Sequence, residues 1–200
     1  MSSPQKLAHV VLFTRRIPQM RDWYVTVLDG RVVHQNPAAA FITYDDEHHR
    51  IAVTDPAAAA KMAQALFGKS EGLVGAGGAA SVEWTGEQPG NVAPHGLAHI
   101  AFTYDSLEDL LGNYERLKAE SILPTVTINH GTTTSMYFAD PDGNQIELQV
   151  DNFATAAEGT EFMESQSFKN NPVGVAFDAD ELIDKLHSGV PARELMAPTW

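Results

Sequence analysis

Cysteine is absent from all 200 residues of the chain. Its absence excludes disulfide bonds and every reaction or metal site that depends on a thiolate. A metal site in this chain would therefore be built from His, Asp and Glu side chains. Such ligands suit iron, manganese or zinc.

Long apolar runs and an excess of positive charge are also missing. No apolar stretch approaches the roughly 18 residues that a membrane-spanning helix needs. Residues 1–8 lack the charged-then-apolar pattern of a signal peptide, so we expect a cytoplasmic protein without a membrane partner. The formal net charge of -13 argues against a nucleic-acid partner, because phosphates require a basic surface.

A short internal repeat is present. Leu7-Ala8-His9-Val10 recurs as Leu97-Ala98-His99-Ile100, and both copies continue with apolar residues typical of a strand. Each copy is followed by apolar residues at helical spacing and then by three strand-like segments. A turn signal at residues 140–143 separates the last two strands of the second copy. The predicted order of elements, one strand, one helix and three strands, thus occurs twice in the chain.

The repeat predicts an α+β protein with two βαβββ modules that form a curved sheet around a metal cavity. We expect the first module at residues 1–55 and the second at 97–151. Between them, residues 56–96 are rich in Ala and Gly and indicate a short helix followed by a linker or lid. Residues 152–200 form a C-terminal tail with one predicted helix, marked by Leu182, Ile183 and Leu186.

Strand alternation points three ligand-type side chains at this cavity. His9 and His99 occupy equivalent places in the two copies, away from the apolar faces of their strands. Glu147 lies on the polar face of the last strand. Ala52 occupies the corresponding place in the first module, which leaves three ligands and open metal positions. Two His and one carboxylate are the ligand set of non-heme Fe(II) oxygenases.

Each of these residues has a simpler interpretation when taken alone. A single His in a strand is usually a core or surface residue, and a Glu after a turn is usually solvated. Their equivalence in the repeat favours the metal site. Tyr137 is expected on the same face as Glu147. Side chains alternate between the two faces of a sheet, so if Met136 and Phe138 share the apolar face of the last strand, Tyr137 shares the face of Glu147.

The chain resembles the vicinal-oxygen-chelate superfamily, which includes glyoxalases, bleomycin- and fosfomycin-resistance proteins and extradiol dioxygenases. Residues 97–102 and 140–147 are similar to its two ligand strands. Residues 45–52, with His48 and His49, are similar to a His-His segment of type I extradiol dioxygenases. Residues 129–131 and 135–137 resemble their substrate-side His and Tyr.

The resemblance implies cleavage of a catechol-type ring beside its two hydroxyls, with O2 and Fe(II), or Mn(II) in its place. It implies catalytic roles for His49 toward oxygen and for His130 and Tyr137 toward the substrate hydroxyl. We interpret His48 as solvated. The implied partners are a small aromatic diol and further copies of the chain, because related single-domain proteins often form homo-oligomers.

The sequence is also compatible with two other functions. One is a metal-dependent lyase or thiol transferase of the glyoxalase or fosfomycin-resistance kind. Ala52 argues against the four-ligand glyoxalase pattern, and a transferase would leave His49 and Tyr137 without a role. The other is a metal-free module that binds a small aromatic molecule, against which the retention of all three ligand candidates argues.

Overall fold

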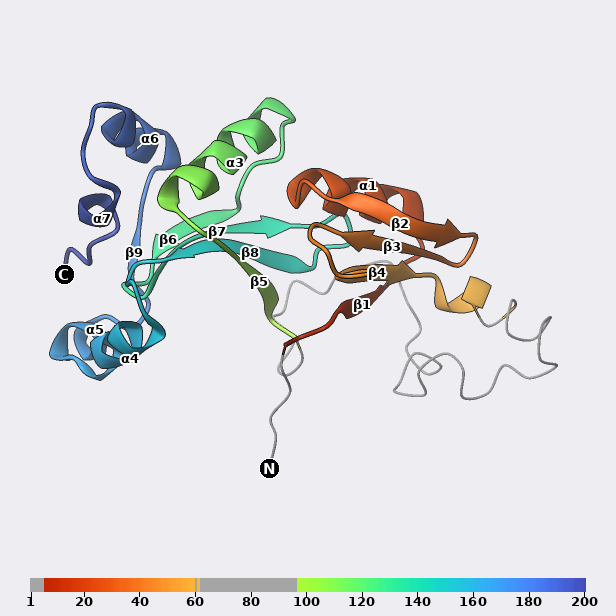
Figure 1. The fold of residues 1–200 in the computed structure, drawn as a ribbon, viewed down its shortest axis with the longest axis horizontal. Coiled ribbons are helices and arrows are strands. Elements are labelled where there is room, and N and C mark those ends of the chain that lie inside the picture. The colour runs from red at the N-terminus through yellow and green to blue at the C-terminus, as the bar shows by residue number, and fades with distance from the viewer. Residues whose placement is uncertain (1–5, 60, 62–96) are drawn as a thin grey trace. The chain divides into compact units, whose positions relative to one another are not determined.

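The computed structural model describes residues 6–59, 61 and 97–200, and these divide into two compact units (Figure 1). Unit 1 comprises the described residues up to 61 together with Asp140–Gly143. Unit 2 comprises residues 97–139 and 144–200. Among the described helices, none has the length and apolar character needed to cross a membrane.

Unit 1 contains the first βαβββ module. Its sheet has the order β1-β4-β3-β2, with β1 parallel to β4 and the other pairs antiparallel. The elements are β1 (Val10–Phe13), α1 (Ile17–Val27), β2 (Arg31–Asn36), β3 (Ala39–Thr43) and β4 (Ile51–Thr54).

Helix α1 forms and packs as its sequence pattern predicts. Pro18 lies in the first turn, where its missing N–H costs no hydrogen bond. Met20, Tyr24 and Val27 follow at helical spacing and are buried against β3 and β4. Gly30 then lets the chain turn into β2, because a Cβ there would lie 2.8 Å from the Thr43 carbonyl oxygen.

Unit 2 contains the second module and the C-terminal tail. Its sheet has the order β5-β8-β7-β6-β9, in which β5 and β8 are parallel and the remaining pairs antiparallel. The module's elements are β5 (His99–Tyr104), α3 (Leu107–Ala119), β6 (Val126–Asn129), β7 (Thr133–Ala139) and β8 (Gln145–Asp151). The α+β class and the two βαβββ modules are thus confirmed, and each module has its own sheet.

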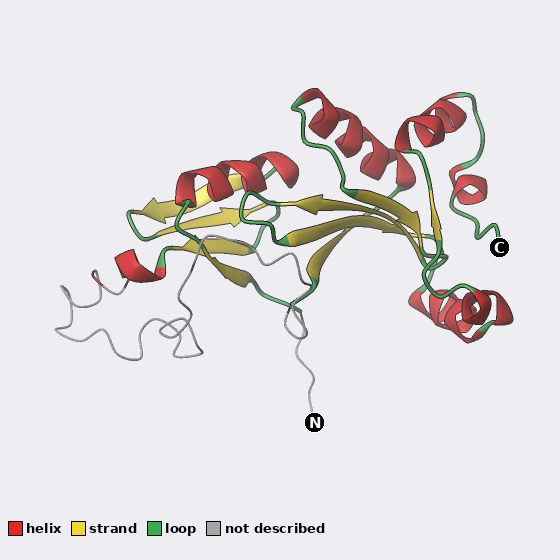
Figure 2. Ribbon diagram, turned by 180° about the vertical axis from the view of Figure 1, so that it is seen from behind, coloured by secondary structure: helices red, strands yellow, loops and turns green. Residues whose placement is uncertain are grey.

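Helix α3 covers one face of this sheet (Figures 1 and 2). Ser106 caps it by accepting a hydrogen bond from the Asp109 amide. Its apolar residues recur at helical spacing and are buried: Leu107, Leu110, Leu111, Tyr114 and Leu117. The opposite face of the sheet is left for polar side chains.

The C-terminal tail carries more structure than the single helix that we predicted. It contains α4 (Ala156–Glu164), α5 (Gln166–Asn170), β9 (Val175–Ala176), α6 (Ala179–His187) and α7 (Ala192–Leu195). The predicted helix is α6. The others were missed because α5, β9 and α7 are too short to show a period, and α4 buries no residue. A capping box at Thr155 and Glu158 was the readable signal for α4.

The predicted linker or lid at residues 56–96 lies almost wholly outside the described residues. Residues 56–59 are helical, as we expected for its start.

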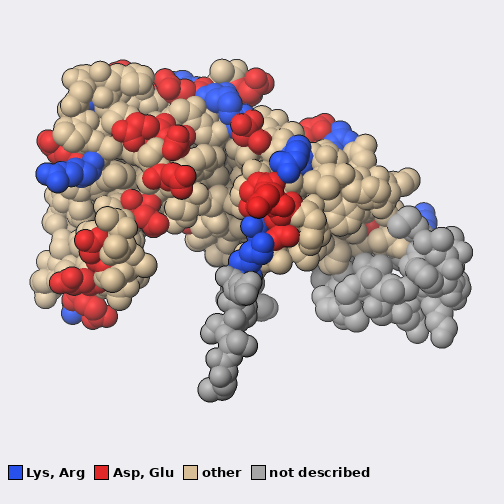
Figure 3. All heavy atoms as spheres, in the orientation of Figure 1, with Lys and Arg blue, Asp and Glu red and all other residues tan. Residues whose placement is uncertain are grey.

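Acidic side chains are spread over the face of the molecule drawn in Figure 3, with Lys and Arg side chains between them. Lys118 and Asp180 form an ion pair, with 2.6 Å between the ammonium nitrogen and a carboxylate oxygen, which joins α3 to α6.

Candidate active site

Strands β7 and β8 place Tyr137 directly opposite Glu147. Opposed residues of an antiparallel pair project from the same face of the sheet. Their neighbours project from the other face and are buried in the core: Met136, Phe138, Ile146 and Leu148. The parity prediction for Tyr137 is therefore confirmed.

Glu147 is only 5% exposed, and both of its carboxylate oxygens have a partner. Oε2 lies 3.0 Å from His99 Nε2, and the Tyr137 hydroxyl donates to Oε1 at 2.9 Å. Buried carboxylates require such partners, because removing a charge from water is otherwise very costly. His99 starts β5, and its ring meets the Tyr137 ring edge-on, with 5.6 Å between centroids.

His130 extends this series of hydrogen bonds. It follows the end of β6, and its Nε2 lies 2.9 Å from the Tyr137 hydroxyl. Its other ring nitrogen, Nδ1, lies 2.6 Å from the carbonyl oxygen of Val173 in the tail. The four side chains His99, Glu147, Tyr137 and His130 thus form one connected polar series on the face away from α3.

The surroundings of Tyr137 keep its hydroxyl protonated. Burial raises the pKa of Tyr137 well above its usual range, and the hydrogen bond to Glu147 and the charge of that carboxylate raise it further. At neutral pH the phenol is therefore a hydrogen-bond donor. Neutralising the charge on Glu147, as a bound cation would do, removes one of these causes, whereas burial remains.

In unit 1, three histidine rings gather where β1 begins and β4 begins. The His9 and His49 ring centroids are 4.3 Å apart, and the His48 and His49 Nδ1 atoms are 2.6 Å apart. Phe41 of β3 meets the His49 ring edge-on at 5.1 Å. His49 is half-buried, whereas the His48 side chain is 68% exposed.

Burial lowers the pKa of His49, and the neighbouring His9 and His48 lower it further. The carboxylate of Glu47 acts in the opposite direction. The neutral imidazole is therefore favoured at His49 near pH 7. In this form one ring nitrogen accepts a hydrogen bond and the other donates one.

The loop that carries His49 is braced by Asp45 and Arg50. Arg50 Nη2 lies 2.9 Å from Asp45 Oδ2, and this hydrogen-bonded guanidinium holds the pKa of Asp45 below its usual value. Arg50 Nη1 also donates to the carbonyl oxygens of Leu7 and Ala8, at 2.8 and 3.1 Å. A single guanidinium therefore ties the His49 loop to the segment that precedes His9.

The repeat extends to the strand registers. Val10 pairs with Ile51 in the first module, and Ile100 pairs with Ile146 in the second. Ala52 consequently occupies the place that Glu147 has in unit 2, as the sequence comparison predicted. One difference concerns the strand ends: β1 begins at Val10, so His9 immediately precedes its strand, whereas His99 lies within β5.

The predicted site residues fall into two groups. His99, Glu147, Tyr137 and His130 come together in unit 2, and His9 and His49 come together in unit 1. Within the described part of the chain, no three or more His, Asp or Glu side chains form a ready metal-binding group. The three-ligand site of His9, His99 and Glu147 stays a prediction.

Three groups that hold the His49 loop and His130 in place were not predicted from the sequence. They are Asp45, Arg50 and the Val173 carbonyl. The charged run of residues 45–50 was visible, but nothing in it shows which acid pairs with Arg50. Every residue has a backbone carbonyl, so no sequence pattern identifies the one that contacts His130.

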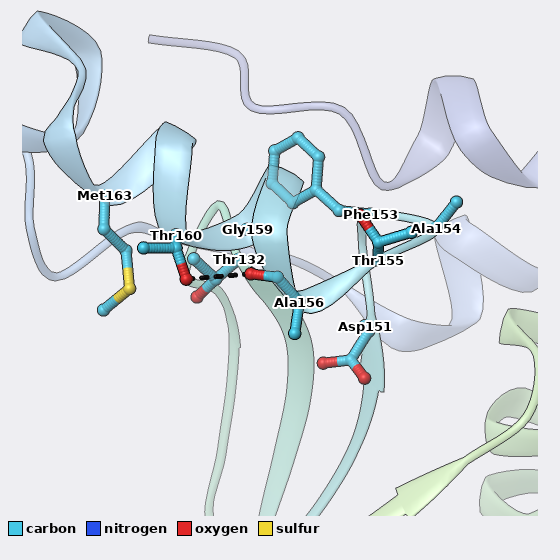
Figure 4. Close-up of a pocket in the computed structure, with 9 residues that line it drawn as sticks. All are labelled: Thr132, Asp151, Phe153, Ala154, Thr155, Ala156, Gly159, Thr160 and Met163. Carbon is cyan, nitrogen blue, oxygen red and sulfur yellow. Dashed lines mark hydrogen bonds between the residues drawn. The ribbon is translucent and has the colours of Figure 1, made fainter.

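A separate hollow of about 220 Å³ opens beside α4 in unit 2 (Figure 4). Thr132, Asp151 and residues of α4 line it, and Met163 lies at one side. None of the predicted site residues lines this hollow.

The chain matches the family model of the Glyoxalase/Bleomycin resistance protein/Dioxygenase superfamily over residues 6–148, and it belongs to this superfamily. It is 42% identical to Biphenyl-2,3-diol 1,2-dioxygenase 2 of Rhodococcus globerulus over 200 residues, covering all of this chain and 91% of that protein. It is 39% identical to Biphenyl-2,3-diol 1,2-dioxygenase 3 of the same organism, covering all of this chain and 92% of that protein.

Solved structures agree on the fold. A lactoylglutathione lyase from Agrobacterium tumefaciens is similar with a TM-score of 0.51 and 17% identity, covering 74% of this chain and 96% of that one. A glyoxalase/bleomycin resistance protein/dioxygenase from Nocardioides gives a TM-score of 0.50 and 18% identity, covering 76% and 86%. At these identities the likeness concerns the fold alone.

Proposed function

We propose that this protein is an extradiol dioxygenase that cleaves a catechol-type ring beside its vicinal hydroxyls with O2. The observation that carries the proposal is the similarity, along the entire chain, to two biphenyl-2,3-diol 1,2-dioxygenases. We therefore expect a 2,3-dihydroxybiphenyl-like diol as substrate. The polar series of unit 2 supports this reaction, because it offers groups that take up and hold a hydroxyl proton.

We further propose that His9, His99 and Glu147 bind one Fe(II), with Mn(II) as the alternative. The donor set fits: Glu147 is buried, carries a negative charge and has His99 Nε2 at 3.0 Å from one of its oxygens. Nitrogen and oxygen donors without thiolates suit these metals. When bound, the metal supplies open positions for the diol oxygens and for O2 and conducts electron density between them.

In this proposal His130 and Tyr137 handle the substrate proton. The Tyr137 hydroxyl and His130 Nε2 are 2.9 Å apart, a distance at which a proton passes between hydrogen-bonded partners. A diol hydroxyl placed beside Tyr137 would pass its proton to the phenol oxygen, while the phenol proton, donated to Nε2 in place of Glu147, passes to His130. The phenol is then protonated before and after the transfer, the form that burial favours by raising its pKa.

His49 would act on the oxygen side of the reaction. Its pKa is lowered by burial and by two neighbouring histidines, so the neutral ring is available to accept or donate a proton. The Asp45–Arg50 brace holds its loop in place. The lyase or transferase alternative gives neither His49 nor Tyr137 a role.

The test is an assay of Fe(II)-reconstituted protein against a panel of diols that includes biphenyl-2,3-diol and unsubstituted catechol. Anaerobic binding is followed by the catecholate spectrum, and turnover by oxygen uptake with a yellow ring-opened product. We expect one O2 consumed for each diol cleaved. Binding without oxygen uptake for every diol would refute the reaction, and glutathione-dependent lyase activity in a parallel assay would favour the alternative.

A further inference from the structure

The C-terminal tail contacts the turn that carries His130. The proposed reaction assigns no other role to this tail. Strand β9 pairs antiparallel with the end of β6, where Asn129 lies opposite Val175. The side-chain nitrogen of Asn129 also donates to the carbonyl oxygen of Met196 at 2.9 Å. The tail therefore contacts the residue immediately before His130 from two directions.

One contact of the tail reaches His130 itself. The Val173 carbonyl oxygen lies 2.6 Å from Nδ1 of the ring. A carbonyl oxygen only accepts hydrogen bonds, so the short distance requires a proton on Nδ1. In neutral His130, Nε2 is then the hydrogen-bond acceptor, and it faces the Tyr137 hydroxyl at 2.9 Å. The single proton of that hydroxyl can be donated to Nε2 or to Glu147 Oε1, but not to both at once.

Gly174 makes this approach possible. Its φ of +102° lies in the region that glycine tolerates. A Cβ at this position would lie 2.1 Å from the Asn129 carbonyl oxygen and 2.8 Å from the Cα of His130. Any larger residue would therefore push the tail, and the Val173 carbonyl with it, away from the ring.

Asn171 closes the segment into a rigid loop. Its side-chain oxygen accepts from the Gly174 amide, and its side-chain nitrogen donates to the Gly174 carbonyl, both at 3.0 Å. On the other side of His130, the side-chain nitrogen of Asn152 donates to the side-chain oxygen of Asn129 and to the Gly131 carbonyl oxygen, at 3.0 and 3.1 Å. Both neighbours of His130 are thus fixed.

We propose that residues 171–174 of the tail are a positioning element that sets the tautomer of His130. The Val173 carbonyl holds the proton on Nδ1, Gly174 allows the close approach, and Asn171 keeps the loop in shape. This inference rests on the proposed function for the catalytic consequence alone: Nε2 is kept free to exchange a proton with Tyr137 and the diol. The tautomer itself is a property of the protein without substrate.

The first test compares Gly174→Ala with Gly189→Ala. Gly189 has a similar φ of +95°, but a Cβ there meets nothing within 4 Å, so this variant controls for backbone strain in the tail. The tautomer is measured by nitrogen-15 NMR on Zn(II)-loaded protein, because Fe(II) would broaden the signals. The signal of His130 is assigned by its loss in His130→Gln.

We expect the neutral His130 ring of the wild type and of Gly189→Ala to carry its proton on Nδ1, and Gly174→Ala to lose this preference. In the Fe(II) enzyme, kcat of Gly174→Ala should fall roughly 10- to 100-fold, with a smaller change in KM for the diol. A wild-type His130 without a proton on Nδ1 would overturn the proposal. So would Gly174→Ala with an unchanged tautomer.

A milder pair covers the case in which Gly174→Ala fails to fold. Asn171→Ala removes both clamping hydrogen bonds, whereas Asn170→Ala removes only an exposed bond from Gln166. Asn171→Ala should shift the tautomer and Asn170→Ala should not, and equal behaviour of the two refutes the proposal. Failure of the proposed reaction is recognised separately, as a wild type with the expected tautomer that consumes no oxygen with any diol.

Discussion

Tyr137 and Glu147 form a directly opposed cross-strand pair, joined by a 2.9 Å hydrogen bond from the phenol to one carboxylate oxygen. The other oxygen faces His99 at 3.0 Å. A single carboxylate therefore links a proposed metal ligand to the proton-handling pair of Tyr137 and His130. This arrangement separates two effects that mutation can distinguish, the loss of metal and the loss of proton transfer.

Tyr137→Phe should retain its metal and its fold but lose turnover. The ring still packs against His99, while the donor to Glu147 and the partner of His130 are removed. We expect kcat to fall by about 10²–10⁴-fold, the usual contribution of an acid–base group. Oxygen uptake and metal content measure the two properties. Tyr114→Phe is the control, because it removes a tyrosine hydroxyl bonded to Asp180 away from the site. An unchanged kcat in Tyr137→Phe would refute the role.

His99→Ala and Glu147→Ala should each lose the metal. Removal of one ligand of three is expected to weaken binding by more than the roughly 10- to 100-fold that an outer hydrogen-bond partner typically contributes. Metal content after dialysis gives the answer. Gln149→Ala, two residues along the same strand face, controls for changes in β8. Near-full occupancy in both ligand variants would exclude the proposed site.

His49→Phe should keep its iron and still bind a diol without oxygen. Its turnover should fall by about 10²–10⁴-fold, because the neutral imidazole is replaced by a ring of similar size without an exchangeable proton. The catecholate spectrum reports binding, and oxygen uptake reports turnover. His34→Phe on exposed β2 serves as the control. Wild-type turnover in His49→Phe would leave His49 as a surface residue.

The Asp45–Arg50 brace predicts a pH-dependent part of the stability. The hydrogen-bonded guanidinium lowers the pKa of Asp45 in the folded protein, so the unfolded chain binds its proton first as the pH falls. The stabilisation is present above the unfolded value of about 3.9 and is lost as the pH falls through the folded pKa. Asp45→Asn should therefore be less stable than the wild type at neutral pH and lose this deficit in acid.

Urea unfolding at a series of pH values measures the difference between Asp45→Asn and the wild type. Asp46→Asn, an exposed neighbour, controls for the change in net charge. A difference in unfolding free energy that stays constant from neutral pH to pH values well below about 3.9 would show that the brace does not stabilise the fold.

We predict a homo-oligomer from the exposed apolar side chains of the C-terminal tail. Met163 is 49% exposed and Val175 is 41% exposed, and an interface between copies of the chain would cover them. Light scattering at micromolar concentration should give a mass of at least twice 21.7 kDa. A monomer would contradict the prediction, and Met163→Lys should weaken the assembly.

The sequence by itself determined the two modules and the faces of their strands. Alternation with a period of two is a local property, so the side of the sheet that carries Glu147 and Tyr137 followed from the apolar residues beside them. The equivalence of Ala52 and Glu147 followed from the repeat in the same way. These features need no knowledge of how distant segments pack.

Only the tertiary structure decided what holds the proposed catalytic residues in place. The Val173 carbonyl meets His130 across 43 positions of sequence, and Arg50 meets the Leu7 carbonyl across the same separation. In both contacts the acceptor is a backbone oxygen, which every residue possesses and no sequence pattern distinguishes. Their choice depends on long-range packing, because the tail must fold against β6 before its carbonyl can reach the ring.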